Sequence, residues 1–122
     1  MGLDICVGHP SRDGNSIHHS YSGFAAFRRR IARQIGIDLD RMVGFGGRRS
    51  WAKIADPLAA LLNHSDCGGK ISPKACRAAA LRLREVVMEM SDPEDGPVVG
   101  FGEDLAELME ECAKRRMWLH FC

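Results

Sequence analysis

Two helix-start signals constrain the fold of this chain more than any other feature. Asp56-Pro57 and Ser72-Pro73 each place a capping side chain directly before a proline, which is preorganised for the first position of a helix. Beyond the second signal, apolar residues recur at helical spacing: Cys76, Ala79, Ala80, Leu83, Val87 and Met90. The sequence therefore predicts a short helix at 57–63, a polar loop, and a long amphipathic helix at 73–90, with the two helices packed as a hairpin.

Two more helices are predicted from periodicity and capping. Ser20 or Ser22 starts a helix that ends near Ile35, and Gly36 stands where a left-handed residue commonly closes a helix. Residues 101–112 repeat apolar side chains at helical spacing, and their acidic start and basic end suit the helix dipole.

Short strands are expected at both ends of the chain. Residues 3–7 and 117–121 alternate apolar and other side chains, and we expect them to pair because an isolated strand leaves backbone groups unsatisfied. The turn-forming composition of residues 9–16 and 91–97 indicates loops. The predicted fold is α+β, one small domain over 1–122 with about four helices and a minimal sheet formed by the N- and C-terminal strands.

Composition describes an ordinary globular protein, with 45% hydrophobic and 27% charged residues. No apolar run approaches the ~20 residues that a membrane span needs, so we expect no membrane association. The N-terminus shows no basic segment followed by an apolar stretch, and the five cysteines are an odd number. These features predict a cytoplasmic protein with reduced thiols.

Charge is unevenly distributed although the net charge is only +1. Residues 1–61 hold nine Lys/Arg against five Asp/Glu, whereas residues 62–122 hold eight against eleven. The basic half permits an anionic partner, while a solvated helix face is the more general interpretation of any single arginine, Arg28 included. Nucleic acid is not indicated, because a nucleic-acid-binding domain usually shows a stronger basic excess.

One four-residue sequence occurs twice, at residues 43–46 and 99–102, and reads Val-Gly-Phe-Gly in both copies. A functional interpretation is a phosphate-cradling loop, helped after the first copy by Arg48 and Arg49. Neither copy matches a Walker or dinucleotide-binding pattern. The favoured interpretation is structural: the glycines allow a sharp turn while the ring packs into the core.

The polar loop between the first two signalled helices concentrates reactive side chains: His64, Ser65, Asp66 and Cys67. Its outline resembles an EF-hand, but with Gly69 at the sixth position only Asp66 supplies a carboxylate among the four positions that need one. Calcium binding is therefore not expected. His64 and Cys67 form one half of a zinc-ligand pattern, and no second pair follows.

The same loop shows no recognised signature of a nucleophile around Cys67. The favoured interpretation is that Ser65 and Asp66 satisfy backbone donors in a tight turn. The sequence therefore indicates no cofactor, and assigns no residue a catalytic or metal-binding role.

Scattered blocks covering most of the chain resemble a known protein family. They include Ser20-Tyr21-Ser22-Gly23-Phe24, the His64-Ser65-Asp66-Cys67 block and the closing Leu119-His120-Phe121. The chain is similar to small bacterial and phage-encoded proteins that begin Met-Gly-Leu-Asp-Ile and have no established activity. Family members carry Asp-Gly-Glu after the cysteine, where this chain has Gly68-Gly69-Lys70 and so lacks two carboxylates. The resemblance implies a cytosolic protein associated with a phage or prophage.

Two function classes follow from these observations. The first is a non-enzymatic binding module that acts on a host protein or a nucleotide-like, small anionic ligand. Its predicted ligand-binding residues are Tyr21, Arg28, Trp51, His64, Ser65, Asp66 and Cys67. The alternative is a small metal-dependent or Cys/His hydrolase that uses the 64–67 loop together with His19. We favour binding, because these ionisable groups form no complete set for acid–base catalysis or metal ligation.

Overall fold

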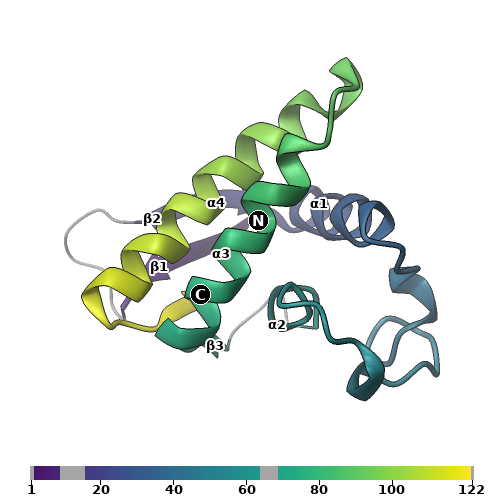
Figure 1. Cartoon of the computed structure of the whole chain (residues 1–122), viewed down its shortest axis with the longest axis horizontal. Coiled ribbons are helices and arrows are strands. Elements are labelled where there is room, and N and C mark those ends of the chain that lie inside the picture. Colours follow the sequence, from purple (N-terminus) through teal and green to yellow (C-terminus); the bar gives the residue numbers. More distant parts are fainter. Residues whose placement is uncertain (1, 9–15, 64–68, 122) are drawn as a thin grey trace.

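The two ends of the chain meet in one antiparallel sheet. The computed structural model describes residues 2–8, 16–63 and 69–121, and in these residues four strands pair in the order β2-β1-β4-β3 (Figure 1). Their bounds are β1 Gly2–Val7, β2 Ser16–Ser20, β3 Lys70–Ile71 and β4 Leu119–Phe121. Ile5 of β1 lies opposite Phe121 of β4, so the predicted pairing of the terminal strands is confirmed.

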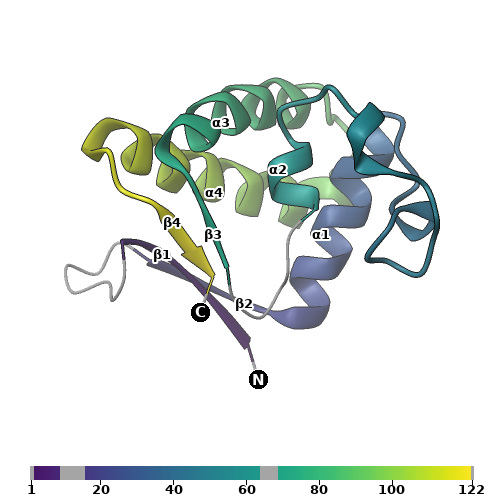
Figure 2. The ribbon, with the colours of Figure 1, turned by 90° about the horizontal axis from the view of Figure 1, so that it is seen from below.

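Four α-helices cover one face of this sheet in the described residues (Figure 2). Their bounds are α1 Tyr21–Gln34, α2 Ala59–Leu62, α3 Pro73–Met88 and α4 Gly96–Arg115. The side chains of Ser20 and Ser72 accept hydrogen bonds from backbone N–H groups in the first turns of α1 and α3. The predicted α+β fold, a single small domain, is confirmed. None of the described helices is long and apolar enough to cross a membrane.

Alternation along the strands separates the two faces of the sheet. The buried side chains that face the helices are Ile5, Val7, Ile71, Leu119 and Phe121. Charged and polar side chains such as Asp4, His18 and Lys70 are exposed. The imidazole of His18 pairs across the strands with the carboxylate of Asp4 at 2.7 Å. The sheet therefore stabilises the fold through one apolar face, as antiparallel sheets commonly do.

The longest helix pair is α3 with α4, which run antiparallel over the sheet. Gly102 lets the two helices approach closely, because a Cβ atom there would lie 2.8 Å from Cγ1 of Val87 on α3. The loss of helix propensity at a glycine is thus offset by packing.

Three local predictions differ from the structure. Residues 16–20 form β2, although the sequence Ser-Ile-His-His-Ser has only one apolar side chain to signal a strand. Residues 70–71 form β3 inside the stretch predicted to be loop. The last helix begins at Gly96, so it includes part of the predicted 91–97 loop and both glycines of the second Val-Gly-Phe-Gly copy.

The expected hairpin around the 64–67 loop is only partly realised. Pro73 is the first residue of α3, as predicted, and Arg82 of α3 donates to the Asp56 carboxylate at 3.0 Å. However, α2 is a single turn, and the long antiparallel partner of α3 is α4.

Candidate functional site

The predicted ligand-binding residues fall into two groups. Tyr21, Arg28 and Trp51 are in the described part of the chain, whereas His64, Ser65, Asp66 and Cys67 lie outside it. The geometry of the site is therefore built from the first group. The role predicted for the 64–67 loop stays a prediction.

Arg28 is buried on the face of α1 that packs into the molecule. Arg28 is only 4% exposed, so the interpretation of this arginine as part of a solvated helix face is wrong. The guanidinium carbon lies 4.7 Å from the ring centroid of Phe24 and 5.1 Å from that of Phe45. A cation over an aromatic face is attracted by the ring quadrupole, and more strongly when water is excluded. Arg28 thus connects α1 to the segment that carries Phe45.

That segment, residues 41–53, is a turn-rich loop and is named the basic loop below. Backbone N–H groups of Val43 and Arg49 donate to the carbonyls of Arg49 and Arg41, at 3.0 and 2.9 Å. Met42 is fully buried and anchors the loop in the core. Gly44 and Gly46 adopt φ angles of +91° and +90°, which L side chains rarely adopt. The loop is therefore built mainly of turns, and it ends in a short 3-10 helix at Trp51–Lys53.

Two aromatic rings lie together in the basic loop. The indole N–H of Trp51 donates to the carbonyl of Val43 at 2.9 Å, and its ring meets Phe45 edge to face at 6.2 Å between centroids. Both rings are partly exposed, and Val43 is 49% exposed beside them. Through Phe45, the structure links Arg28 to Trp51, as one site would require.

Tyr21 is less closely connected to Arg28, Phe45 and Trp51 than these residues are to one another. It is the first residue of α1, is partly buried, and packs at the edge of the hydrophobic core. Within the described part of the chain, it makes no ring contact with Trp51. The predicted common groove of Tyr21 and Arg28 stays a prediction.

Positive charge gathers on the outside of the basic loop. Its exposed cationic residues are Arg41, Arg48, Arg49 and Lys53. The guanidinium of Arg41 lies 3.4 Å from the Asp38 carboxylate, but both side chains are largely exposed, so this pair holds the arginine only weakly. From the sequence, Arg48 and Arg49 were predicted to help a phosphate-cradling loop, and this was the less favoured of the two interpretations. It missed Phe45, whose signal was an aromatic residue between two glycines and just before two arginines.

Of the residues predicted for the hydrolase alternative, His19 is in the described part of the chain, and two described cysteines have buried surroundings. Cys76 and Cys112 are fully buried between α3 and α4. Two causes raise the pKa of the Cys76 thiol well above its usual range: the larger is its hydrogen bond with Cys112, and the second is burial. The ring of His19 lies 4.4 Å from that of Phe101. In residues 2–8, 16–63 and 69–121 no group of three or more His, Cys, Asp or Glu side chains is placed to hold a metal ion.

No protein-family model, curated protein or solved structure matches this chain significantly. The resemblance to phage-encoded proteins, and the prophage association that it implies, therefore stay predictions.

Proposed function

We propose that this protein is a non-enzymatic binding module that recognises a nucleotide-like anionic ligand through the basic loop. The observation that carries the proposal is the combination, in one ordered segment, of four exposed cations with two partly exposed rings. The cations are Arg41, Arg48, Arg49 and Lys53, and the rings are those of Phe45 and Trp51.

The chemistry of these side chains matches the two parts of a nucleotide. Guanidinium groups present parallel N–H donors that pair with phosphate oxygens, and such charge-assisted bonds are stronger than neutral ones. Partly exposed aromatic rings offer a flat apolar area for a base. Phosphate at Arg48 and Arg49 with a base near Trp51 is the arrangement that we propose.

Arg28 has a positioning role in this proposal. Its buried guanidinium lies against Phe45 and so holds the loop to α1. Removing it would displace Phe45 and weaken ligand binding without the loss of any direct contact. The prediction of a direct contact between Arg28 and the ligand is therefore replaced, in this proposal, by an indirect one.

The described residues support binding over catalysis. The thiol of Cys76 is buried with a raised pKa, so it is held protonated and is a poor nucleophile. The ring of His19 packs against the partly buried ring of Phe101. The hydrolase alternative depends on residues 64–67 and stays a prediction.

Isothermal titration calorimetry tests the proposal with ATP, adenosine and inorganic triphosphate as separate probes. ATP should bind, triphosphate more weakly, and adenosine weakest, because the charge contributes most. The variant Arg48→Ala/Arg49→Ala should bind ATP at least about tenfold more weakly, since each lost charge-assisted bond contributes on the order of 1.5–3 kcal/mol. Affinity should also fall as salt is added.

The matched control removes the same charge elsewhere. Arg33→Ala/Arg116→Ala changes two exposed arginines outside the basic loop and should leave the affinity for ATP within about twofold of the wild type. An equal loss of ATP affinity in both double variants would show that ATP responds only to the net charge of the protein and not to the basic loop. No binding of ATP by the wild-type protein would reject the proposed ligand class.

A further inference from the structure

The outer face of the α3–α4 hairpin carries apolar side chains that the molecule itself does not cover. Leu81 is 65% exposed and Met88 is 84% exposed, and residues seven apart lie on nearly the same side of a helix. Two such large exposed side chains in line on one helix mark a contact surface more strongly than scattered ones.

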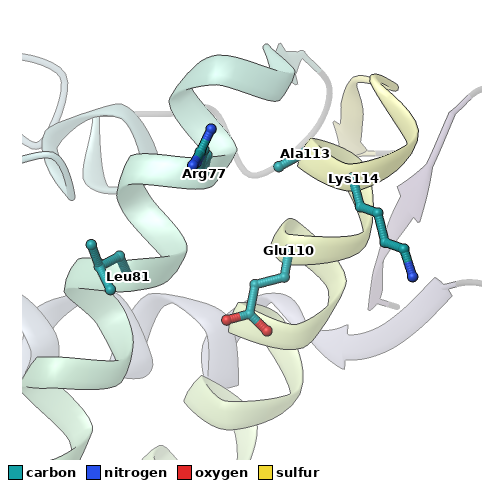
Figure 3. Close-up of a pocket in the computed structure, with 5 residues that line it drawn as sticks. All are labelled: Arg77, Leu81, Glu110, Ala113 and Lys114. Atoms are coloured by element: carbon teal, nitrogen blue, oxygen red, sulfur yellow. The ribbon is translucent and has the colours of Figure 1, made fainter.

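A hollow lies between the two helices on this face. Figure 3 shows Arg77 and Leu81 of α3 on one side of it, and Glu110, Ala113 and Lys114 of α4 on the other. Its volume is about 470 Å³, enough to receive side chains from another surface. Arg84 of α3 donates hydrogen bonds to both carboxylate oxygens of Glu110 on α4, each at 2.7 Å.

Charge on this face is strongly polarised along the hairpin. Because α3 and α4 are antiparallel, the start of α3 lies beside the end of α4, and this end carries Lys74, Arg77 and Lys114. The opposite end carries Glu85 and Glu89 of α3 with Glu103 and Glu107 of α4. The pKa of Arg84 is raised first by its hydrogen bond to Glu110, and also by the negative charges of Glu110, Glu107 and Glu103 on α4.

We propose that the occupant of this face is a second copy of the same chain, bound in an antiparallel, two-fold symmetric arrangement. An isologous dimer brings the same patch of both subunits together. Two-fold symmetry about the middle of the face, near Leu81, places the basic end of each copy against the acidic end of the other. Leu81 then lies near the centre of the contact, and Met88, the last residue of α3, lies about 10 Å away toward the acidic end. A single patch with opposite charges at its two ends is thus complementary to itself.

This inference does not depend on the proposed ligand of the basic loop, which lies on other elements. The dimer covers α3 and α4, and leaves residues 41–53 uncovered.

Sedimentation equilibrium of the full chain provides the measurement, with two charge-reversed variants. Arg77→Glu/Lys114→Glu reverses two of the three positive charges named at the basic end, and Glu103→Lys/Glu107→Lys reverses two of the four negative charges named at the acidic end. All four side chains are exposed, so both variants should fold, which circular dichroism checks. The wild type should have the mass of a dimer at a concentration of about 100 μM, and each variant alone should be a monomer, because the attraction between the two ends is lost in one variant and reversed in the other. A one-to-one mixture of the two variants should restore the dimer.

Leu81→Lys supplies the apolar test and should give a monomer without charge reversal. A wild type that stays monomeric up to about 1 mM would overturn the proposal, because the face would then belong to a partner of another kind. A dimer that survives Leu81→Lys, or a variant mixture that stays monomeric, would overturn it equally, since the contact would lie elsewhere.

Discussion

Residues 43–46 and 99–102 have the same sequence and entirely different structures. In the first copy both glycines have positive φ angles and the phenylalanine lies in a turn of the basic loop. In the second copy all four residues are part of α4, and Phe101 packs edge to face on Phe27 at 4.8 Å between ring centroids. Local sequence therefore does not decide the structure of this motif; its surroundings do.

The surroundings differ in how far apolar periodicity continues. After the second copy, Leu105, Ala106 and Met109 extend a buried stripe at helical spacing, so a helix there buries a continuous apolar face. After the first copy come Gly47, Arg48 and Arg49, which offer no such stripe. Without a face to bury, the glycines take the turn conformations that only they adopt readily. The first copy thus forms turns of the basic loop, whereas the second is a helical segment whose partly buried Phe101 packs against the core.

The largest expected effect distinguishes the two phenylalanines. Phe101→Ala should lower the free energy of unfolding by about 3 kcal/mol, because it removes ring contacts with Phe24 and Phe27 in the core. Phe45→Ala should cost only about 1 kcal/mol, since it loses one edge-to-face contact and one cation–π contact near the surface. Urea denaturation measures both values. Equal costs would contradict the expected difference in packing between the two rings.

A smaller effect of opposite sign distinguishes the equivalent glycines. Gly44→Ala should destabilise the protein by about 1–2 kcal/mol, because its φ of +91° is unfavourable for a residue with a Cβ atom. Gly100→Ala should stabilise it by about 0.5–1 kcal/mol, because the position is helical and no atom lies within 4 Å of the new Cβ. Thermal melts of the two variants decide the matter. Shifts of the same sign would mean that the two copies are more alike than the structure shows.

The smallest effect concerns the ion pairs that flank each copy. Arg30 of α1 donates two hydrogen bonds to Asp95, just before α4, and both side chains are mostly buried. The hydrogen bond from Arg30 is the main reason why the pKa of Asp95 is lowered. A carboxyl whose pKa is lower in the folded state stabilises the fold above its unfolded pKa near 3.8, and this stability is lost as pH falls through the folded value.

Asp95→Asn should therefore reduce the acid sensitivity of folding below about pH 4, and lower stability at neutral pH. Asp40→Asn is the matched control near the basic loop, because its pair with Arg29 is exposed on both sides and should contribute little. Stability curves measured from pH 2 to pH 7 would compare them. If stability depended on pH in the same way in both variants, the Arg30–Asp95 pair would contribute no more to folding than the exposed Arg29–Asp40 pair.

Most of the fold could be predicted wherever a local signal has a specific physical cause. The caps at Ser20 and Ser72, the proline at 73 and the glycine at 36 each mark a helix end that the structure confirms. The strand at residues 16–20 could not be predicted, because its stability comes from pairing with β1 rather than from its own apolar pattern. The early start of α4 was hidden by its glycines and by Pro97, and of these glycines Gly102 is the one that packs closely against α3.

The candidate site was less predictable than the fold. Trp51 and the paired arginines were visible in the sequence as residue types. The burial of Arg28 was not, because it depends on Phe45, which is distant along the chain and approaches α1 only in the folded structure. A long-range contact of this kind leaves no periodic or capping signal in the sequence.

The central claim is that the first Val-Gly-Phe-Gly copy contributes to the proposed binding surface of the basic loop, whereas the second packs in α4 against the core. A nuclear magnetic resonance titration of the labelled protein with ATP tests it most directly. The account predicts shifts in the backbone amides of residues 41–53 and in the indole N–H of Trp51, which bonds to Val43 within the loop. Amides of residues 96–115 should stay in place. Shifts confined to α4, or an unchanged Trp51 indole at saturating ATP, would contradict the claim.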